Sequence, residues 1–156
     1  MIKKILAAAG AAAIAVTGLT PAASAEVAAA PDCQHGSSYG IVVEKVNLTI
    51  GTTVIGRIDL CRDSGYQYWG FVLFNRPATA SQYGQAAIVR YDQVAYFSDV
   101  DCDSPGGNQK VMPGQTRCWT PKYDGRAGRW NFAAVGYLKS SHTGDVLAAE
   151  TTMIQR

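Results

Sequence analysis

The sequence predicts an all-β fold, a single antiparallel β-sandwich or barrel of about seven to nine strands held by two disulfides. Apolar residues recur at a period of two in almost every periodic segment, the spacing of a strand with one buried face. Turn signals such as Asp63-Ser64-Gly65, Pro113-Gly114 and Thr143-Gly144-Asp145 separate these segments. No window carries the apolar stripe of an amphipathic helix.

Seven strands are expected along the chain. In the segment 54–60, Val54, Ile58 and Leu60 fall on one side, whereas Arg57 and Asp59 fall on the other, which predicts a half-buried strand. The same reasoning predicts strands over residues 41–50, 54–60, 66–74, 85–92, 95–100, 130–138 and 146–154. The segment 104–115, SPGGNQKVMPGQ, is rich in turn residues and is expected to form a long loop or a weak hairpin.

The segment 66–74, YQYWGFVLF, is apolar on both faces, which is typical of a central strand covered on both sides. We expect four of its side chains in the core: Trp69, Phe71, Leu73 and Phe74. Tyr66 and Tyr68 lie next to a charged turn, and their hydroxyls need water or a hydrogen-bond partner. We expect these two at the sandwich edge, where they could form a platform for a sugar ring.

The N-terminal residues 1–25 predict a secretory signal peptide. Lys3 and Lys4 precede an apolar stretch over 5–19, and the small-residue pattern Ala23-Ser24-Ala25 follows. The apolar stretch is shorter than the roughly 20 residues that span a bilayer, so no membrane partner is expected after processing. We expect a flexible leader over 26–38, a single β domain over 39–156, and a secreted, extracellular protein.

Charge and cysteine content limit the classes of partner and cofactor that we expect. The chain has 14 Lys+Arg against 12 Asp+Glu, and without Lys3 and Lys4 the numbers are equal, so no nucleic-acid partner is expected. All four cysteines follow residue 25, which predicts two disulfides. Of the three pairings, short loops favour Cys33 with Cys61 and Cys102 with Cys118. Zinc ligands are not clustered, so no metal or cofactor is expected.

The segment 117–130, RCWTPKYDGRAGRW, has four cations, one acid and three interleaved aromatic residues. Aromatic rings and cations together are typical of surfaces that bind anionic polymers. We predict a ligand-binding surface of Trp119, Lys122, Tyr123, Arg126, Arg129 and Trp130, with Tyr66 and Tyr68 as an alternative platform. In a second interpretation, the Cys102–Cys118 bond brings Asp99, Asp101 and Asp103 to Arg117, and the charges form an ion-pair network.

Other chemistries have weaker signals. Asp99, Asp101 and Asp103 repeat the first ligand spacings of a calcium loop, but Ser104 and Lys110 replace its glycine and glutamate. A nucleophilic triad would need His142 with Ser140, Ser141 and Asp145, and no Gly-x-Ser-x-Gly elbow is present. A glycosidase would need two carboxyls at a defined separation, for which the candidates are Glu44 and Glu150.

The segments GRIDLC, YWGFV and RCWTP, together with the Ala-rich N-terminus and four cysteines, resemble small secreted, disulfide-bonded actinobacterial proteins of unknown function. The resemblance covers residues 56–72 and implies no catalytic residues.

The combined sequence features predict a secreted, non-catalytic binding protein for cell-wall or extracellular polysaccharide. One alternative is an inhibitor or another protein-binding module acting on a secreted protease, with the segment 110–122 as the contact and Arg117 or Lys122 entering a trypsin-like pocket. A second alternative is a small hydrolase that uses Glu44, Glu150 or His142.

Overall fold

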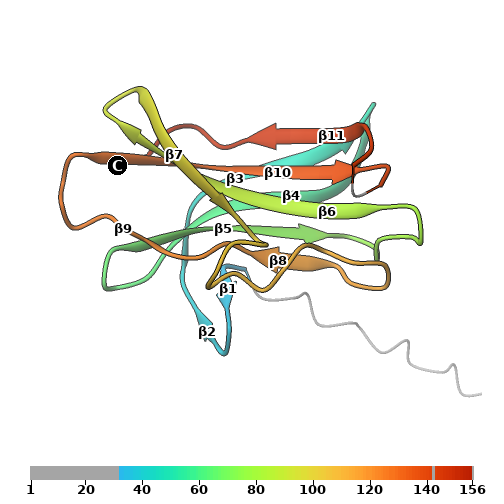
Figure 1. Ribbon diagram of the computed structural model, residues 1–156, viewed down its shortest axis with the longest axis horizontal. Coiled ribbons are helices and arrows are strands. Elements are labelled where there is room, and N and C mark those ends of the chain that lie inside the picture. Colours follow the sequence, from blue (N-terminus) through green and yellow to red (C-terminus); the bar gives the residue numbers. More distant parts are fainter. Residues whose placement is uncertain (1–31, 142, 156) are drawn as a thin grey trace, which may run out of the picture.

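The computed structural model describes residues 32–141 and 143–155, and these form strands and turns without a helix (Figure 1). No helix in this part of the chain could therefore cross a membrane. The strands in chain order are β1 (Gln34–His35), β2 (Ser38–Tyr39), β3 (Ile41–Ile50), β4 (Thr53–Arg62), β5 (Gln67–Phe74), β6 (Tyr83–Asp92), β7 (Ala95–Asp101), β8 (Arg117–Trp119), β9 (Tyr123–Asp124), β10 (Trp130–Lys139) and β11 (Val146–Thr151).

Two antiparallel sheets face each other. One has the order β3-β4-β5-β8, with β9 also paired to β5, and the other has the order β11-β10-β6-β7. The all-β, sandwich-like prediction is therefore confirmed, as are strands in all seven expected segments, although several ends differ by a few residues. Four short strands were not predicted, because two or three residues are too few to show a period and only their pairing partners define them: β1, β2, β8 and β9.

Alternating side chains of β5 supply two separate cores. Tyr68, Val72 and Phe74 face the four-stranded sheet and join the main core, which includes Ile58 and Phe132. The remaining positions point away from that sheet into a smaller core made of Cys33, Cys61, Trp69, Phe71 and Leu73. The prediction that the four β5 residues are core is confirmed, since each is at most 8% exposed.

The hairpin β1–β2 covers the smaller core. Trp69 Nε1 donates a hydrogen bond to the Gln34 carbonyl at 3.2 Å. A Cβ on Gly40 would lie 2.2 Å from the Trp69 ring, so the chain passes close over the indole. Residues 32–38, which the sequence assigned to a flexible leader, thus form ordered structure because Trp69 and a disulfide hold them. The predicted signal peptide, 1–25, lies outside the described residues.

Both predicted disulfides are present. Cys33 bonds to Cys61 and fastens the hairpin to the outer face of β4. Cys102, just after β7 of the four-stranded sheet, bonds to Cys118 in β8 of the five-stranded sheet. The second bond therefore joins the two sheets directly, and both bonds are fully buried.

The burial of Asp59 contradicts the prediction that β4 has one face exposed to water. Its side chain is 0% exposed, because the segment that contains Asp32 covers the face expected to meet water. Arg57 Nε donates to Asp59 Oδ2 at 3.3 Å, and Arg57 also pairs with Asp32, which Lys45 contacts at 3.2 Å. Burial raises the pKa of Asp59 from 3.8 to about 6, although the charge of Arg57 opposes the shift.

The raised pKa predicts a pH dependence of stability. Between about pH 4 and 6 the folded state holds a proton on Asp59 that the unfolded chain has released, so the free energy of unfolding falls as the pH rises. At about 1.4 kcal/mol per pKa unit, we expect a decrease of up to roughly 3 kcal/mol. Urea titrations at a series of pH values between about 4 and 6 should show this decrease in the free energy of unfolding. The slope should become smaller in Asp59→Asn, and an unchanged slope would contradict the assignment to Asp59.

Candidate ligand-binding site

A pocket of about 340 Å³ opens at the end of the sandwich where β5 and β10 begin, on the left in Figure 1. The end of β4, the β4–β5 turn and the loop between β9 and β10 form its walls. Its lining is aromatic, cationic and glycine-rich: Arg62, Tyr66, Tyr68, Gly125, Arg126, Gly128, Trp130 and Phe132.

Tyr68 and Phe132 form the floor of the pocket. Their rings stack with centroids 4.5 Å apart and planes inclined by 16°, and both are buried. The exposed edge position expected for Tyr68 is therefore wrong, because Tyr68 packs in the main core. Tyr68 comes from β5 and Phe132 from β10, so this stack also packs one sheet against the other. A Cβ on Gly125 would lie 2.5 Å from the Tyr68 ring, so the β9–β10 loop approaches the floor at a position that only glycine permits.

Tyr66 forms the exposed lip of the pocket and is 53% exposed. Its backbone has φ of 58°, a left-handed conformation that a bulky residue rarely adopts. Asp63 holds this turn, because its Oδ1 accepts hydrogen bonds from the amides of Gly65 at 2.9 Å and Gln67 at 3.0 Å. The Gly125 amide donates to the Tyr66 carbonyl at 2.8 Å and joins the two sides of the pocket.

Two arginines give the pocket its charge. Arg62 Cζ lies 4.9 Å from the Tyr66 ring centre, and among the described residues it has no acidic partner. Its buried Nε also has no hydrogen-bond partner there. Arg126 pairs with Asp124 at 2.6 Å, and its hydrogen bonds lower the pKa of Asp124 to about 2. Arg62 therefore leaves an uncompensated positive charge beside the aromatic floor.

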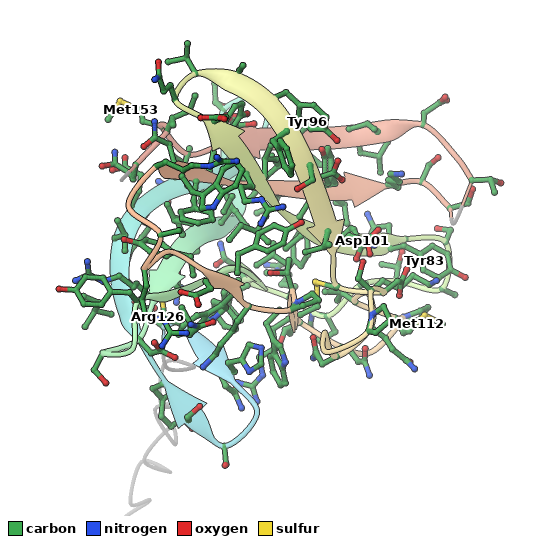
Figure 2. All side chains as sticks on the ribbon, turned by 60° about the vertical axis from the view of Figure 1, so that its left-hand side comes forward. Tyr83, Tyr96, Asp101, Met112, Arg126 and Met153 are labelled. Atoms are coloured by element: carbon green, nitrogen blue, oxygen red, sulfur yellow. A yellow bond between two sulfur atoms is a disulfide. The ribbon has the colours of Figure 1, made fainter. Side chains whose placement is uncertain are left out.

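Trp130 closes the far side of the pocket and is itself surrounded by cations. Arg129 lies 4.1 Å and Arg90 4.5 Å from the centre of its ring, which also packs against Phe97 at 4.8 Å. These contacts orient the indole from outside the pocket. Figure 2 turns this end of the sandwich forward and shows Arg126 on it.

The structure joins the two platforms that the sequence offered as alternatives. Tyr66, Tyr68, Arg126 and Trp130 all line the pocket, because β9 pairs with the start of β5 and brings the second segment beside the first. Tyr123 and Arg129 flank it through contacts with Phe132 and Trp130.

Two predicted residues lie elsewhere. Trp119 is opposite Phe71 on the outer face of the five-stranded sheet, with its ring centre 6.0 Å from that of His35. Lys122 Nζ lies 4.7 Å from the Trp69 ring centre and pairs with Asp63 at 2.8 Å. These side chains support the hairpin and the β4–β5 turn and do not line the pocket.

The sequence missed Arg62, Arg90 and Phe132. Arg62 lies opposite Tyr68, and Arg90 lies opposite Phe132, so all three follow from strand pairing. No local motif marks them. Arg62 is four residues before Tyr66 and Phe132 is two residues after Trp130, so both lie close in sequence to predicted residues, but only the register of the strands shows which way they face. Arg90 is far from both segments, and the pairing of β6 with β10 brings it to the site.

The acidic segment does not neutralise Arg117. Asp103 Oδ2 pairs instead with Lys110 at 3.4 Å, and its Oδ1 accepts the Lys110 amide at 3.0 Å. Asp101 accepts a hydrogen bond from the Asp103 amide. Asp99 accepts a hydrogen bond from the hydroxyl of Tyr96, which lies on the same strand, β7. Figure 2 shows Tyr96 and Asp101. The three carboxylates have separate partners, and within the described residues no group of three or more His, Cys, Asp or Glu side chains is placed to hold a metal ion.

Residues of the alternative functions also have defined positions. Arg117 is half-buried in β8, and Lys122 pairs with Asp63 at 2.8 Å. Glu44 and Glu150 lie on β3 and β11, the neighbouring edge strands of the two sheets, and Glu44 accepts a hydrogen bond from Gln155 at 3.5 Å. His142 lies outside the described residues.

The chain matches no protein-family model, no curated protein and no solved structure. The resemblance to small secreted proteins of unknown function remains a prediction. Fold and pocket together define a disulfide-bonded β-sandwich with an aromatic, cationic pocket at one end.

Proposed function

We propose that the protein is a secreted, non-catalytic binding module for cell-wall or extracellular polysaccharide, and that the pocket at the start of β5 and β10 holds the sugar. The observation that carries this proposal is the combination of an aromatic floor, the exposed Tyr66 ring and the unpaired Arg62 in one pocket. Two disulfides are consistent with an oxidising, extracellular environment.

The lining has the chemistry that a sugar requires. Tyr66 presents an amphipathic ring to solvent, against which the C–H face of a pyranose can pack while the phenol hydroxyl bonds to its rim. The pocket volume lies within the usual range for small-ligand sites. Because hydrogen bonds of Asp63 and Gly125 already hold the lip, little conformational entropy is lost when the ligand binds.

Arg62 favours a polysaccharide that carries carboxylates. A guanidinium without an acidic partner can form a bidentate pair with a carboxylate, as in a uronic acid or an acidic wall polymer. Stacking on Tyr66 already orients the Arg62 fork for such a contact. A neutral sugar would contact the aromatic surface but leave Arg62 without an anionic partner.

The first test is the effect of Tyr66→Ala on co-sedimentation with purified cell wall and with insoluble polysaccharides. Loss of the exposed ring should weaken binding about tenfold, the effect of roughly 1.4 kcal/mol of lost stacking. Tyr39→Ala is the matched control, since Tyr39 is 57% exposed but lies on β2 and does not line the pocket. It should bind like the wild-type protein.

The salt dependence of binding distinguishes the contribution of Arg62 from that of the aromatic rings. Binding of an acidic polymer should weaken with salt, and Arg62→Gln should reduce that dependence. If the wild-type protein binds no polymer at low salt, or if Tyr66→Ala binds as strongly as Tyr39→Ala, the polysaccharide proposal is wrong.

A further inference from the structure

A second pocket, of about 500 Å³, opens at the opposite end of the sandwich, on the right in Figure 1, where β3 and β5 end. Its walls are mainly apolar and include Ile50, Val54, Ile55, Phe74, Ala78 and Leu138. Nothing in the proposed polysaccharide site uses these residues.

Both sheets contribute to the walls, so a ligand would enter between them. Phe74 comes from β5 of the five-stranded sheet, and Leu138 comes from β10 of the four-stranded sheet. A β-bulge shapes the mouth: Leu48 pairs with Gly56 and Thr49 with Val54, which leaves Ile55 as an extra residue on β4. The bulge lets neighbouring residues Val54 and Ile55 both line the pocket, whereas a regular strand would point them to opposite faces.

The loop after β5 holds the pocket open. The Asn75 amide donates to the Ile55 carbonyl at 2.9 Å, and Asn75 Nδ2 donates to the Val54 carbonyl at 3.0 Å. The Ala78 amide donates to the Gln115 carbonyl, and its own carbonyl accepts from the Gly114 amide, both at 2.9 Å. The loop is therefore braced from both sides, and the pocket exists before a ligand arrives.

The apolar surface at the mouth is open to solvent. Ile50 is 43% and Val54 is 44% exposed, although both adjoin a deeper wall of buried Phe74 and Leu138. The side chains of Asn75 and Gln82 already have hydrogen-bond partners: Asn75 donates to the Val54 carbonyl on β4, and Gln82 Oε1 accepts the Thr79 amide at 3.2 Å. Few polar groups remain for a sugar, whereas an aliphatic chain would cover the exposed surface.

Arg76 is the only charged residue of this lining. Its side chain is exposed, and it has no ion pair or side-chain hydrogen bond within the described part of the chain. No carboxylate lines the pocket to oppose it. An apolar cavity with one unpaired guanidinium at its rim is complementary to an aliphatic chain that ends in an acidic group.

We propose that this pocket binds an amphipathic molecule of the fatty-acid class, with its chain between the sheets and its carboxylate on Arg76. The site is independent of the proposed polysaccharide site, because the two pockets share no residue and lie at opposite ends of the sandwich.

The test is a fluorescence titration of the oxidised protein with dansyl-undecanoate, followed by displacement with dodecanoate or dodecanol. The dansyl emission should rise on binding, and dodecanoate should displace the probe. Arg76→Gln should weaken dodecanoate binding about tenfold, the usual effect of losing a charge-assisted hydrogen bond, and leave dodecanol binding unchanged. Val54→Trp, which fills the mouth, should abolish binding of both competitors.

The control is Arg126→Gln, the same substitution at the opposite end, which should leave dodecanoate binding unchanged. Equal dodecanoate affinity of Arg76→Gln and the wild-type protein would overturn the carboxylate assignment, and no probe binding by the wild-type protein would overturn the site. Polymer co-sedimentation by Arg76→Gln should equal that of the wild-type protein, so failure of this proposal is distinguishable from failure of the polysaccharide proposal.

Discussion

Phe132→Ala is expected to lower the free energy of unfolding by about 3–5 kcal/mol, as large-to-small substitutions of buried aromatic residues do. The ring is fully buried, stacks on Tyr68 and contacts Tyr123. The Phe132 backbone exchanges two hydrogen bonds with Gln155, so the strand has little freedom to move into the space left by the ring. A cavity would therefore remain beneath the candidate site.

Urea unfolding followed by far-UV circular dichroism measures this effect. Phe97→Ala is the matched control, because Phe97 is 52% exposed, and its loss should cost less than about 1 kcal/mol. Phe132→Ala should also weaken polysaccharide binding, since the floor of the pocket is lost. A destabilisation no larger than that of Phe97→Ala would show that the two sheets do not depend on this stack.

Removal of the Cys33–Cys61 bond, by Cys33→Ala with Cys61→Ala, is expected to lower the free energy of unfolding by about 3–4 kcal/mol. The chain-entropy model gives this value for a bond between residues 28 positions apart. The loss should also free the β1–β2 hairpin, because the remaining tether of the hairpin to the sheet includes the Trp69–Gln34 hydrogen bond and the ion pairs of Asp32. Trp69 and Phe71 would then meet water.

Urea titration measures the stability, and limited proteolysis with tryptophan fluorescence reports the hairpin. The variant should be cleaved near residues 34–40 and show red-shifted emission under conditions in which the sheets stay folded. Removal of Cys102–Cys118 is the control: its loop of 16 positions predicts a similar loss of stability, about 3 kcal/mol, without release of the hairpin. Resistance of the hairpin to protease in the first variant would show that packing alone holds it.

Several features of the fold followed from local pattern. The period-two alternation located seven strands, and the doubly apolar segment 66–74 identified a strand covered on both faces. Asp59 was assigned to the wrong environment for the same reason: alternation separates two faces but does not say what covers each one. Here the distant Asp32 segment covers the second face, and a carboxylate became buried.

The candidate site was predicted in part. Tyr66, Tyr68, Arg126 and Trp130 were named because aromatic and cationic residues concentrate in their segments, and all four line the pocket. Trp119 lies in the same aromatic and cationic segment, 117–130, but its side chain is on the outer face of the sheet. The reason is that β8 and β9 pair with different parts of β5.

Local composition and periodicity were sufficient for the fold class, the seven longer strands and the disulfide count, because each depends on residues close together in the chain. The pairing of Tyr68 with Tyr123, the approach of Arg90 to Trp130 and the pocket around Arg76 depend on strand register and on the joining of two sheets. Register and sheet packing are set by contacts between segments far apart in sequence, so no single segment contains the information that specifies them.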